Sequence, residues 1–378
     1  MTAASGRHLV LVGAGHAHLE VLRRFGRRPV RDLRLTLVTR SARVAYSGMI
    51  PGVIAGRHAL GDAQIDVAAL ARRAGADLCL DAANGLDLAR RHLLCAAGPP
   101  LSYDLLSLDP GGAPDDAAVP GAAAHAIPVK PLDDLVGALA ALRARLAARG
   151  GGHVAVVGAG AGGIEILLAL EHRLRADLPR AQITLTLVCG GDDILPGHPA
   201  AFRERVRAIL AARGIGLAVG ARAVAVEPEH LHLAGRPALA ADAVVWATGA
   251  AAPPWLRETG LPLDADGFVR VDASLRVAGC RNIFAAGDAA SFDPRPLPKS
   301  GVYAVRQGPV LARNLARCLT DRALRPFRPQ GEALTILATG DGGALATRNG
   351  LVVEGAWVRW WKDRIDRRFV ARYRDRTA

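Results

Sequence analysis

Two stretches of this chain repeat one pattern, in which apolar residues run directly into glycines and then into a helical repeat. In the first stretch, HLVLVGAGHAHLEVLRRF from His8 to Phe25, four apolar residues precede Gly13 and Gly15. Leu9 to Val12 suit a strand buried on both faces, and the apolar residues after Gly15 recur at helical spacing. A strand, a glycine turn and a helix in this order let the backbone approach a pyrophosphate, whose charge then lies on the N–H groups of the helix start.

The second stretch, HVAVVGAGAGGIEILLAL from His153 to Leu170, completes the GxGxxG pattern with Gly158, Gly160 and Gly163. In the first stretch the third glycine position is His18. Because that glycine normally lets helix and strand pack closely, we expect a slightly displaced first helix. Two such loops predict two bound dinucleotides. The alternative is two unrelated turns between strand and helix, in a chain that contains 42 glycines.

Length and charge narrow the class of protein. With 378 residues, 51% of them apolar, the chain is long enough for two or three globular domains. Its formal charge of +13 would suit nucleic acid, anionic lipid or phosphorylated cofactors. However, the arginines are spread along the chain except at the C-terminus, and neither interleaved aromatic residues nor a zinc-binding spacing occurs. We therefore expect no nucleic-acid partner and no metal.

The cysteines and the hydropathy pattern bear on location. The five cysteines form no CxxC motif, and no secretory leader precedes the first predicted strand. No uncharged apolar run of about 18 residues occurs, so we expect no membrane-spanning helix. These features predict a reducing, cytoplasmic location.

The first glycine loop is followed by a second predicted strand, Arg34 to Val38. The acidic residue that usually binds a ribose at the end of this strand is replaced by Thr39 and Arg40. Thr39 offers a hydroxyl and Arg40 a cation for adenine or a phosphate, although a solvated arginine is equally consistent. From Val44 to Gly52 an apolar, turn-rich segment stands where a helix is usual, and we predict a loop that lines a ligand.

The middle of the chain repeats this organisation. The Pro- and Ala-rich segment from Ala113 to Pro131 indicates a connector, and Leu132 to Ala148 a helix. Gln182 to Val188 is the partner strand of the second loop, again without an acidic residue at its end, so a 2′-phosphate on the second nucleotide is neither indicated nor excluded. The other predicted elements include helices from Ile65 to Ala74 and Phe202 to Arg213, and strands from Asp77 to Leu80, Tyr103 to Leu108 and Ala243 to Thr248.

A late buried strand carries an acidic residue where ligands bind. Asn282 to Ala286 predicts the strand, and Asp288 follows at its carboxyl end, the edge at which open α/β sheets bind ligands. Its carboxylate suits sugar or ribityl hydroxyls, and a cap on the next turn is the alternative. Pro298 to Gly301 then opens a helix from Val302 to Leu319, whose first amides present a partial positive charge.

The last predicted helix, Trp357 to Tyr373, is amphipathic. Trp357, Trp361, Ile365 and Phe369 repeat every four residues, and eight Lys or Arg lie between residues 359 and 376. Such a helix lies on an anionic membrane surface, docks on its own protein, or forms a dimer contact.

Six motifs of this chain occur together: Val12–Gly15, Tyr46–Pro51, Gly158–Glu165, Ala247–Gly249, Ala285–Asp288 and Pro298–Gly301. They resemble the flavoproteins with two dinucleotide-binding domains, the pyridine nucleotide-disulfide oxidoreductase superfamily. Within it the chain is similar to type II NADH dehydrogenases and sulfide:quinone oxidoreductases, and especially to the flavoprotein that some bacteria carry fused to selenophosphate synthase. The resemblance covers nearly the whole chain. It implies an α/β fold with two Rossmann-like domains of the glutathione-reductase type, plus a small C-terminal α+β segment.

By this resemblance FAD lies against the first glycine loop, with Asp288 on its ribityl and phosphate region and the amides after Gly301 near the flavin ring. Ser47 to Pro51 would pass beside the isoalloxazine, and the second glycine loop would bind NADH or NADPH. The predicted cofactor-binding residues are Gly13, Ala14, Gly15, His16, Thr39, Arg40, Ser47, Gly48, Met49, Pro51, Gly158, Gly160, Gly163, Gly249, Gly287, Asp288, Lys299, Ser300, Gly301 and Val302.

Disulfide reductases of this superfamily carry a redox CxxxxC where this chain has Ser47 to Pro51, and no cysteine is present there. The resemblance therefore implies electron transfer from flavin directly to an acceptor. Sulfide:quinone oxidoreductases need a cysteine pair with one member in or beside the second glycine loop, and Ala161 to Gly163 holds none. We therefore do not expect sulfide chemistry, and we expect Cys318 to serve in packing.

Two residues are candidates for catalysis by the same resemblance. A glutamate placed like Glu165 lies near the meeting point of nicotinamide and flavin in the related dehydrogenases, and the alternative is a first-turn acid favoured by the helix dipole. Lys130 stands in a segment similar to a lysine-containing one of those enzymes and is expected to approach the flavin. A solvated linker lysine is equally consistent.

These features predict an FAD-dependent NAD(P)H oxidoreductase that passes electrons to a quinone or another small acceptor. A flavoprotein acting on a selenium or sulfur metabolite and a non-catalytic module that senses NAD(P)H remain alternatives. The predicted domains are residues 1–125 and 251–325 for FAD, 126–250 for NAD(P)H, and 326–378 for the C-terminal strands and basic helix. The location is cytoplasmic, and peripheral attachment to the inner face of the membrane or a homodimer contact are options for the last helix.

Overall fold

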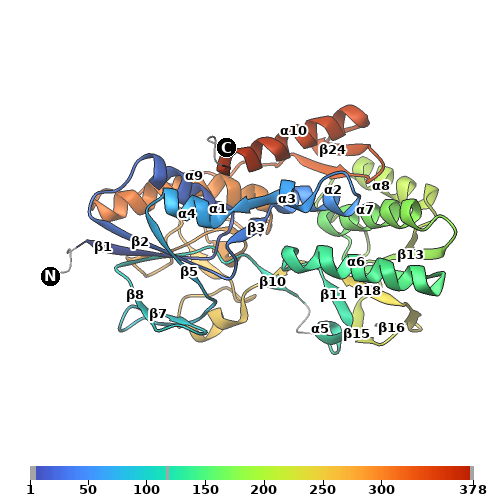
Figure 1. The fold of residues 1–378 in the computed structure, drawn as a ribbon, viewed down its shortest axis with the longest axis horizontal. Coiled ribbons are helices and arrows are strands. Elements are labelled where there is room, and N and C mark those ends of the chain that lie inside the picture. Colours follow the sequence, from blue (N-terminus) through green and yellow to red (C-terminus); the bar gives the residue numbers. More distant parts are fainter. Residues whose placement is uncertain (1–5, 116–118, 375–378) are drawn as a thin grey trace.

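The computed structural model describes residues 6–115 and 119–374 and is built on two five-stranded parallel sheets (Figure 1). In the first sheet β1 is the central strand, and the first glycine loop leaves from its carboxyl end. The strand order is β21-β9-β1-β2-β5: Ile283–Ala285, Leu105–Leu108, Arg7–Val12, Leu33–Thr39 and Ala76–Leu80. Every neighbouring pair is parallel, as the buried apolar runs of the sequence predict.

The second sheet repeats this arrangement around the second glycine loop, with β12 as its central strand. Its order is β11-β18-β12-β13-β14: Ala126–Pro128, Ala243–Trp246, Gly151–Val157, Gln182–Val188 and Gly216–Ala218. All its pairs are parallel too. Strand β11 lies in the segment expected to be a connector. A three-residue strand that ends in proline has no periodic pattern of its own, and here its pairing with β18 makes it a strand.

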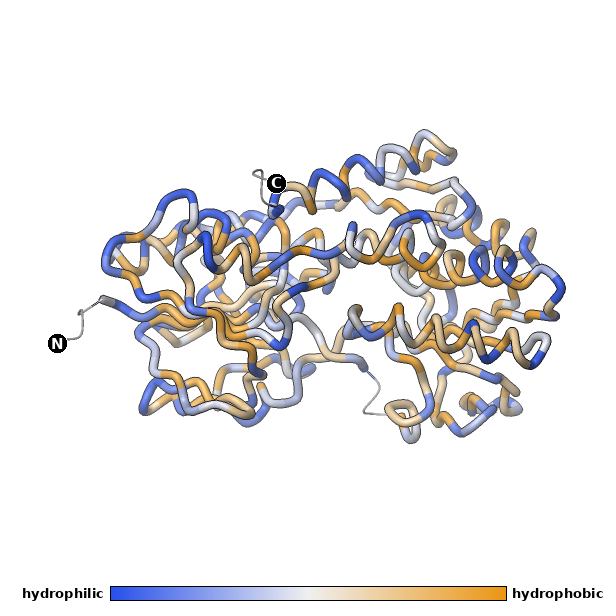
Figure 2. Tube along the Cα trace, viewed as in Figure 1, coloured by the Kyte–Doolittle hydropathy of each residue, from blue (hydrophilic) through white to orange (hydrophobic). Residues whose placement is uncertain are grey.

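Helices cover these sheets and place both glycine loops at helix starts. On the first sheet α1 (His16–Arg27), α4 (Val67–Arg73) and α9 (Gly301–Leu319) share one apolar core with the strands. On the second, α6 (Leu132–Arg149), α7 (Ala161–Asp177) and α8 (Ala200–Ala212) pack on the face that carries Val154 and Val156. Ala155 and Val157 point the other way, toward the antiparallel strands β15 (Ala223–Glu227), β16 (His230–Leu233) and β17 (Leu239–Ala240). Figure 2 shows both sheets as predominantly hydrophobic layers.

The expected loop from Val44 to Gly52 is in fact partly helical. It contains β3 (Arg43–Ala45), the short 3-10 helix η1 (Ser47–Met49) and α2 (Ile50–Ile54). Pro51 is tolerated because it stands in the first turn of α2, where its missing N–H needs no partner. Ile50 and Ile54 are buried in the core of the second sheet, so this packing selects the helix.

The helix expected from Ile65 starts two residues later than predicted. Ile65 belongs to β4 (Gln64–Asp66), which pairs with β3, and Asp66 caps α4 by accepting a hydrogen bond from Ala69 N at 2.7 Å. The remaining elements are α3 (Leu60–Ala63), β6 (Ala83–Asp87), β7 (His92–Cys95), β8 (Leu101–Ser102), β10 (Ala113–Pro114), α5 (Ala122–His125), β19 (Ala250–Ala251), η2 (Pro254–Glu258), β20 (Val269–Val271), η3 (Gly287–Ala289) and β22 (Ala290–Phe292).

The C-terminal segment is a three-stranded antiparallel sheet followed by α10 (Ala356–Tyr373), which lies along the top of the molecule in Figure 1. Its strands are β23 (Thr335–Ala338), β24 (Ala344–Arg348) and β25 (Leu351–Glu354). Phe369, Val370 and Tyr373 are buried in the core of the first sheet, so α10 docks on its own protein. Within residues 6–115 and 119–374, no helix is long and apolar enough to cross a membrane.

Candidate cofactor and acceptor site

The first glycine loop is pressed against the end of β9. Gly13 has φ +88°, and a Cβ on it would collide with the backbone of Asp109 and Pro110, while a Cβ on Gly15 would collide with the Asp109 carboxylate. Gly15 N also donates to Asp109 O at 3.1 Å. These two positions therefore require glycine, as the pattern predicts. The amides of Ala14 and His16 have no hydrogen-bond partner among the described residues and remain available to a ligand.

Asp109 is a part of this loop that the sequence did not reveal. Its carboxylate is 1% exposed and accepts hydrogen bonds from Ala17 N at 2.8 Å and His18 N at 3.0 Å, at the start of α1. Burial raises the pKa of Asp109 well above its usual range, against the effect of these amides. The residue follows the predicted strand Tyr103 to Leu108 and opens the run Asp-Pro-Gly-Gly, whose composition indicates a sharp turn. Its position at the end of β9 was the available signal.

His18, at the third glycine position, is fully buried and connects loop, helix and strand. Its Nδ1 lies 2.7 Å from Gly13 O and its Nε2 2.8 Å from Ser107 Oγ. Burial lowers the pKa of His18 to about 4, so the ring is neutral at physiological pH. At this position a glycine would allow the helix to pack closely on the strand. The imidazole of His18 occupies that space instead and hydrogen-bonds to both neighbours.

The second glycine loop is open toward solvent. A Cβ on Gly158 or Gly163 would collide with backbone, so these two glycines serve the turn and the packing of α7 on the sheet. A Cβ on Gly160 or Gly162 would meet nothing. In the described chain the amides from Gly160 to Gly163 have no partner, so the start of α7 offers N–H groups and room for a pyrophosphate.

Between the two sheets, predicted residues from distant parts of the chain meet. Lys130 Nζ bonds Asp288 Oδ2 at 2.9 Å, which joins the segment before α6 to the end of β21. A Cβ on Gly301 would lie 3.6 Å from His16 Cε1 and 3.8 Å from Ser47 Oγ, so these three residues are neighbours. The amides of Gly301 and Val302, at the start of α9, have no partner among the described residues.

Other predicted residues lie farther from this group or face elsewhere. Thr39 is buried at the end of β2 and its hydroxyl donates weakly to Ser41 O at 3.4 Å, while Arg40 beside it is exposed. Lys299 Nζ donates to Ala290 O at 2.6 Å and lies 3.6 Å from the centre of the Phe268 ring. Burial lowers the pKa of Lys299 to about 8. Its amine therefore stabilises the segment before α9 and is not directed at Asp288.

The remaining predicted cofactor-binding residues lie in the segment from η1 to α2, after β18 and β21, and directly before α9. Gly48 and Met49 stand in η1 and Pro51 in α2, while Gly287 N donates to Gln307 Oε1 at 2.7 Å. Gly249 follows β18 with open space around it, and Ser300 is the residue before α9.

Helix α10 adds a buried charged cluster that the sequence analysis missed. Lys362 Nζ donates to Gly48 O at 2.7 Å and to Asp366 Oδ2 at 2.8 Å. Tyr46 donates to Asp366 Oδ1 at 3.1 Å, and its ring stacks on Phe369 with 4.3 Å between ring centres. An amphipathic helix normally exposes its basic residues, but the side chains of Lys362 and Arg359 are only 8% and 9% exposed.

Glu165 completes this cluster from α7. Its Oε1 accepts a hydrogen bond from Ala338 N of β23 at 2.8 Å and lies 3.8 Å from Lys362 Nζ. Burial raises the pKa of Glu165, and the Lys362 charge opposes that rise. The pKa of Lys362 is itself raised, because Glu165 and Asp366 outweigh its desolvation. One cluster thus joins the first glycine-loop unit, the second and the C-terminal segment.

Comparisons with known proteins match this geometry. Residues 7–308 match the family described as pyridine nucleotide-disulphide oxidoreductase. The chain belongs to this family. It is 30% identical over 302 residues to the NADH dehydrogenase-like protein Rv1812c of Mycobacterium tuberculosis, which covers 75% of this chain and 74% of the relative. It is 31% identical over 210 residues to demethylphylloquinone reductase NdbB of Synechocystis, covering 53% of this chain.

The matched part spans 50% of NdbB and 51% of the alternative NAD(P)H-ubiquinone oxidoreductase C1 of Arabidopsis thaliana, about half the length of these relatives. Among solved structures, sulfide:quinone oxidoreductase from Aquifex aeolicus is similar with a TM-score of 0.82 at 17% identity, covering 98% of this chain and 92% of the other. NDH2 from Plasmodium falciparum gives 0.79 at 13% identity and 97% coverage of both chains. These likenesses confirm the predicted two-domain fold.

The family is named after a disulphide, but none of the cysteines of this chain lies in the segment from Ser47 to Pro51. All five cysteines, at positions 79, 95, 189, 280 and 318, are free. Cys318 Sγ points to Arg281 O at 3.9 Å near the end of α9, in keeping with a packing role.

Proposed function

We propose that this protein is an FAD-dependent NAD(P)H oxidoreductase that passes electrons to a quinone or a similar small acceptor. The observation that carries the proposal is the pair of glycine loops at the carboxyl edges of the two parallel sheets, each presenting amides that have no partner within residues 6–115 and 119–374. The names of the relatives support it, because they describe NADH dehydrogenase-like proteins and reductases of demethylphylloquinone and ubiquinone. The absence of cysteine from residues 46–51 supports direct transfer without a protein disulfide.

The described residues fit the two cofactors. The amides of Ala14 and His16 would bind the FAD pyrophosphate, Asp288 its ribityl hydroxyls, and the start of α9 the flavin ring. Gly160 to Gly163 would bind the NAD(P)H pyrophosphate, in the space that no Cβ fills. When bound, the flavin supplies the two-electron chemistry between nicotinamide and acceptor. Lys130 would hold Asp288 in position through their 2.9 Å bond.

The buried cluster on α10 would manage protons for the acceptor. A quinone that takes two electrons also takes two protons, and Lys362 Nζ is a charged donor held at Gly48 O beside the flavin segment. Asp366 and Glu165 stabilise this charge, and Tyr46 fixes Asp366. We propose that Lys362 donates one of these protons to the quinone, that Glu165, a buried carboxyl with a raised pKa, returns a proton to Lys362, and that water reprotonates Glu165. The hydride of NAD(P)H accounts for the other proton.

An anaerobic titration of the yellow protein tests the reaction. NADH and NADPH are added separately while the flavin absorbance at about 450 nm is followed by stopped flow. The reduced protein is then mixed with a soluble quinone. Bleaching by a pyridine nucleotide followed by reoxidation on quinone is the expected result. A flavin that stays oxidised would identify a non-catalytic nucleotide-binding module. A flavin that is reduced but is reoxidised only by sulfur or selenium compounds would identify such a compound, and not a quinone, as the acceptor.

We further propose peripheral attachment to an anionic membrane through the outer side of α10 and β25. Trp357, Trp360 and Ile365 are 56%, 64% and 40% exposed, and Leu351 on β25 is 75% exposed. Arg364 lies over the Trp360 ring at 5.8 Å, and further arginines surround this apolar surface. Aromatic and basic side chains together suit the membrane interface, where a lipid-soluble quinone is present.

This attachment is tested without deleting the helix, because α10 also supplies Lys362 and Phe369. The triple variant Trp357→Ser/Trp360→Ser/Ile365→Ser should lose binding to anionic liposomes at low salt and keep NADH oxidation with a soluble quinone. Equal liposome binding by variant and parent would refute attachment, and a concentration-dependent dimer that this variant abolishes would assign the surface to a homodimer. Loss of liposome binding by the variant would support peripheral attachment, as the proposed location on the inner face of the membrane requires.

For the domains, we propose the division at residues 125, 250 and 325. It is supported by β21, which adds residues 283–285 to the first sheet after the second sheet is complete. Limited proteolysis would test it, with stable fragments expected to end near residues 125, 250 and 325.

A further inference from the structure

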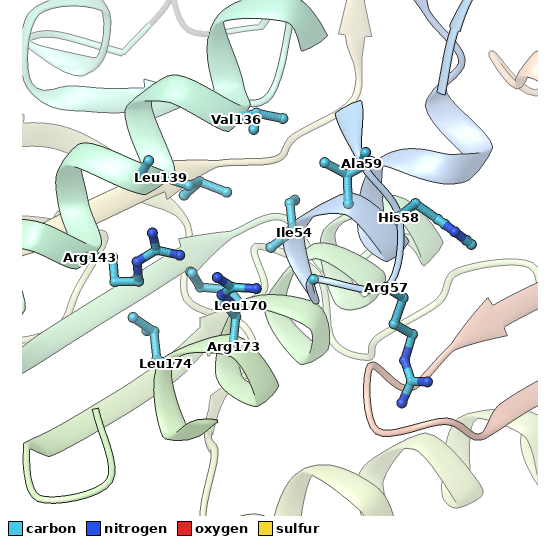
Figure 3. A pocket seen from close by; sticks show the side chains of 13 residues that line it. Ile54, Arg57, His58, Ala59, Val136, Leu139, Arg143, Leu170, Arg173 and Leu174 are labelled. Atoms are coloured by element: carbon cyan, nitrogen blue, oxygen red, sulfur yellow. The ribbon is translucent and has the colours of Figure 1, made fainter. Parts of the chain in front are cut away.

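A cavity of about 460 Å³ lies between α2 with the loop after it, the first two thirds of α6 and the later turns of α7 (Figure 3). Its walls are about equally polar and apolar, and the apolar part includes Ile54 of α2, Leu139 of α6 and Leu170 and Leu174 of α7. This volume falls within the range of sites for small organic ligands, which are mostly apolar with a few polar groups.

Two arginines supply the polar groups of this cavity. Arg143 of α6 and Arg173 of α7 line it, and Figure 3 shows their guanidinium groups close together among the apolar side chains. Both form ion pairs with the same oxygen, Asp177 Oδ2, Arg143 through Nη1 at 2.9 Å and Arg173 through Nε at 2.8 Å. In the described part of the chain, Asp177 is the only carboxylate within ion-pair distance of either arginine. Two cations thus share one anion, and several N–H donors remain for another acceptor.

The neighbouring loop keeps Arg173 in the cavity. Gly56, with φ +76°, lies so close to Arg173 Nη1 that a Cβ there would collide with it. The other two basic side chains of the lining are directed outward. Arg57 Nε donates to Gly340 O at 2.9 Å, and His58 Nε2 lies 3.2 Å from Asp363 Oδ1. The cavity therefore has one charged end and an apolar body.

The cavity is separate from the cofactor and acceptor site. Arg173 stands eight residues beyond Glu165 on α7, about 12 Å along the helix axis. None of the residues that line the cavity belongs to the glycine loops or to the Lys362 cluster.

We propose that this cavity binds a small carboxylate with an apolar body, such as a medium-chain fatty acid. The two guanidinium groups would bind the carboxylate in the bidentate geometry that arginine favours. The chain would lie against Leu139, Leu170 and Leu174 and exclude water from them. Because α2 forms the opposite wall, a bound carboxylate joins the first glycine-loop unit to the second and stabilises the folded protein.

Titration calorimetry with sodium decanoate, on the full chain as purified and without NADH, tests this proposal. The double variant Arg143→Gln/Arg173→Gln should bind decanoate at least tenfold more weakly, and Arg180→Gln, an exposed arginine three residues beyond α7, should bind as the parent does. Decanamide, which lacks the charge, should also bind at least tenfold more weakly. Inorganic phosphate should not raise the melting temperature, whereas decanoate should.

Three results would overturn the proposal. They are equal decanoate affinity in the parent and the double variant, phosphate binding as tight as decanoate binding, and competition between decanoate and a short-chain quinone, which would make the cavity part of the acceptor site. If the double variant fails to fold, Ala140→Phe tests the same cavity, because Ala140 is exposed on α6 and lines it. This variant should abolish decanoate binding, and unchanged binding would refute the site. All these readouts are independent of the proposed reaction.

Discussion

Replacing Lys362 by methionine removes the only cation that Asp366 contacts among the described residues, while it keeps a side chain of similar length. The amine lies 2.8 Å from Asp366 Oδ2 and 3.8 Å from Glu165 Oε1. Removing one partner of a buried ion pair costs about 3–5 kcal/mol, because the remaining carboxylate is left uncompensated. We therefore expect the free energy of unfolding of Lys362→Met to fall by about 3–5 kcal/mol at neutral pH.

Urea unfolding followed by circular dichroism measures this loss. The double variant Lys362→Met/Asp366→Leu removes both charges and should recover most of it, and the exposed Arg364→Met on the same helix should change stability by less than about 0.5 kcal/mol. The double variant should still accept hydride from NAD(P)H but reduce quinone slowly. A loss below about 1 kcal/mol for Lys362→Met would mean that water screens the cluster, and quinone reduction at the parental rate would remove Lys362 from the proton path.

The pH dependence gives a second check on this cluster. Burial raises the pKa of Glu165, so its contribution to stability is complete below its unfolded pKa and is lost as the pH rises through its folded pKa. Without Lys362 the folded pKa of Glu165 should rise further. The defect of Lys362→Met should therefore shrink as the solution is acidified, and a defect that grows on acidification would contradict this reasoning.

Three further predictions concern the glycine loops and Glu165. Gly15→Leu should abolish FAD binding, measured by the flavin absorbance of the purified protein, because its side chain would displace the Asp109 carboxylate, whereas Gly61→Ala, at an open position, should bind FAD normally. Asp109→Asn should make the free energy of unfolding fall less steeply as the pH rises. The pKa of Asp109 is raised in the folded state, so its contribution to stability is complete below the unfolded pKa of 3.8 and is lost as the pH rises through the folded pKa. Parallel plots of unfolding free energy against pH for variant and parent would disprove this. Glu165→Ala should keep FAD, slow flavin reduction by NAD(P)H in stopped flow, and lower stability by about 1–3 kcal/mol as Ala338 N loses its acceptor. An unchanged rate of flavin reduction would remove Glu165 from the nicotinamide side, and an unchanged rate of quinone reduction as well would leave it a purely structural acid.

The fold could be predicted because each glycine loop follows a strand with a strong local signal. The buried runs at β1, β12, β13 and β18 and the glycines themselves specify two parallel sheets before any long-range contact is known. Strand β11 and helix α2 carry no such pattern. Their conformations depend on β18 and on the core of the second sheet, which a local pattern does not contain.

The last helix shows how a spacing of four residues misleads. Four residues turn a helix by about 400°, so the stripe from Trp357 to Phe369 drifts by about 120° over three steps. Phe369 is accordingly buried while Trp357 and Ile365 are exposed. The inner face instead carries Lys362 and Asp366, whose burial depends on carboxylate and hydroxyl partners far away in the sequence. The Lys362 cluster on the acceptor side therefore could not be predicted from the sequence, whereas the two glycine loops could.

The discontinuous first sheet imposes an order on biosynthesis. Its outer strand β21 and the covering helix α9 are translated only after every strand of the second sheet has been translated. The second sheet can therefore form first, while the edge of β9 that pairs with β21 remains unpaired. An exposed edge of this kind pairs readily with other chains. A chain that stops short of residue 283 is thus expected to aggregate through the unpaired edge of β9, even though its second sheet is complete.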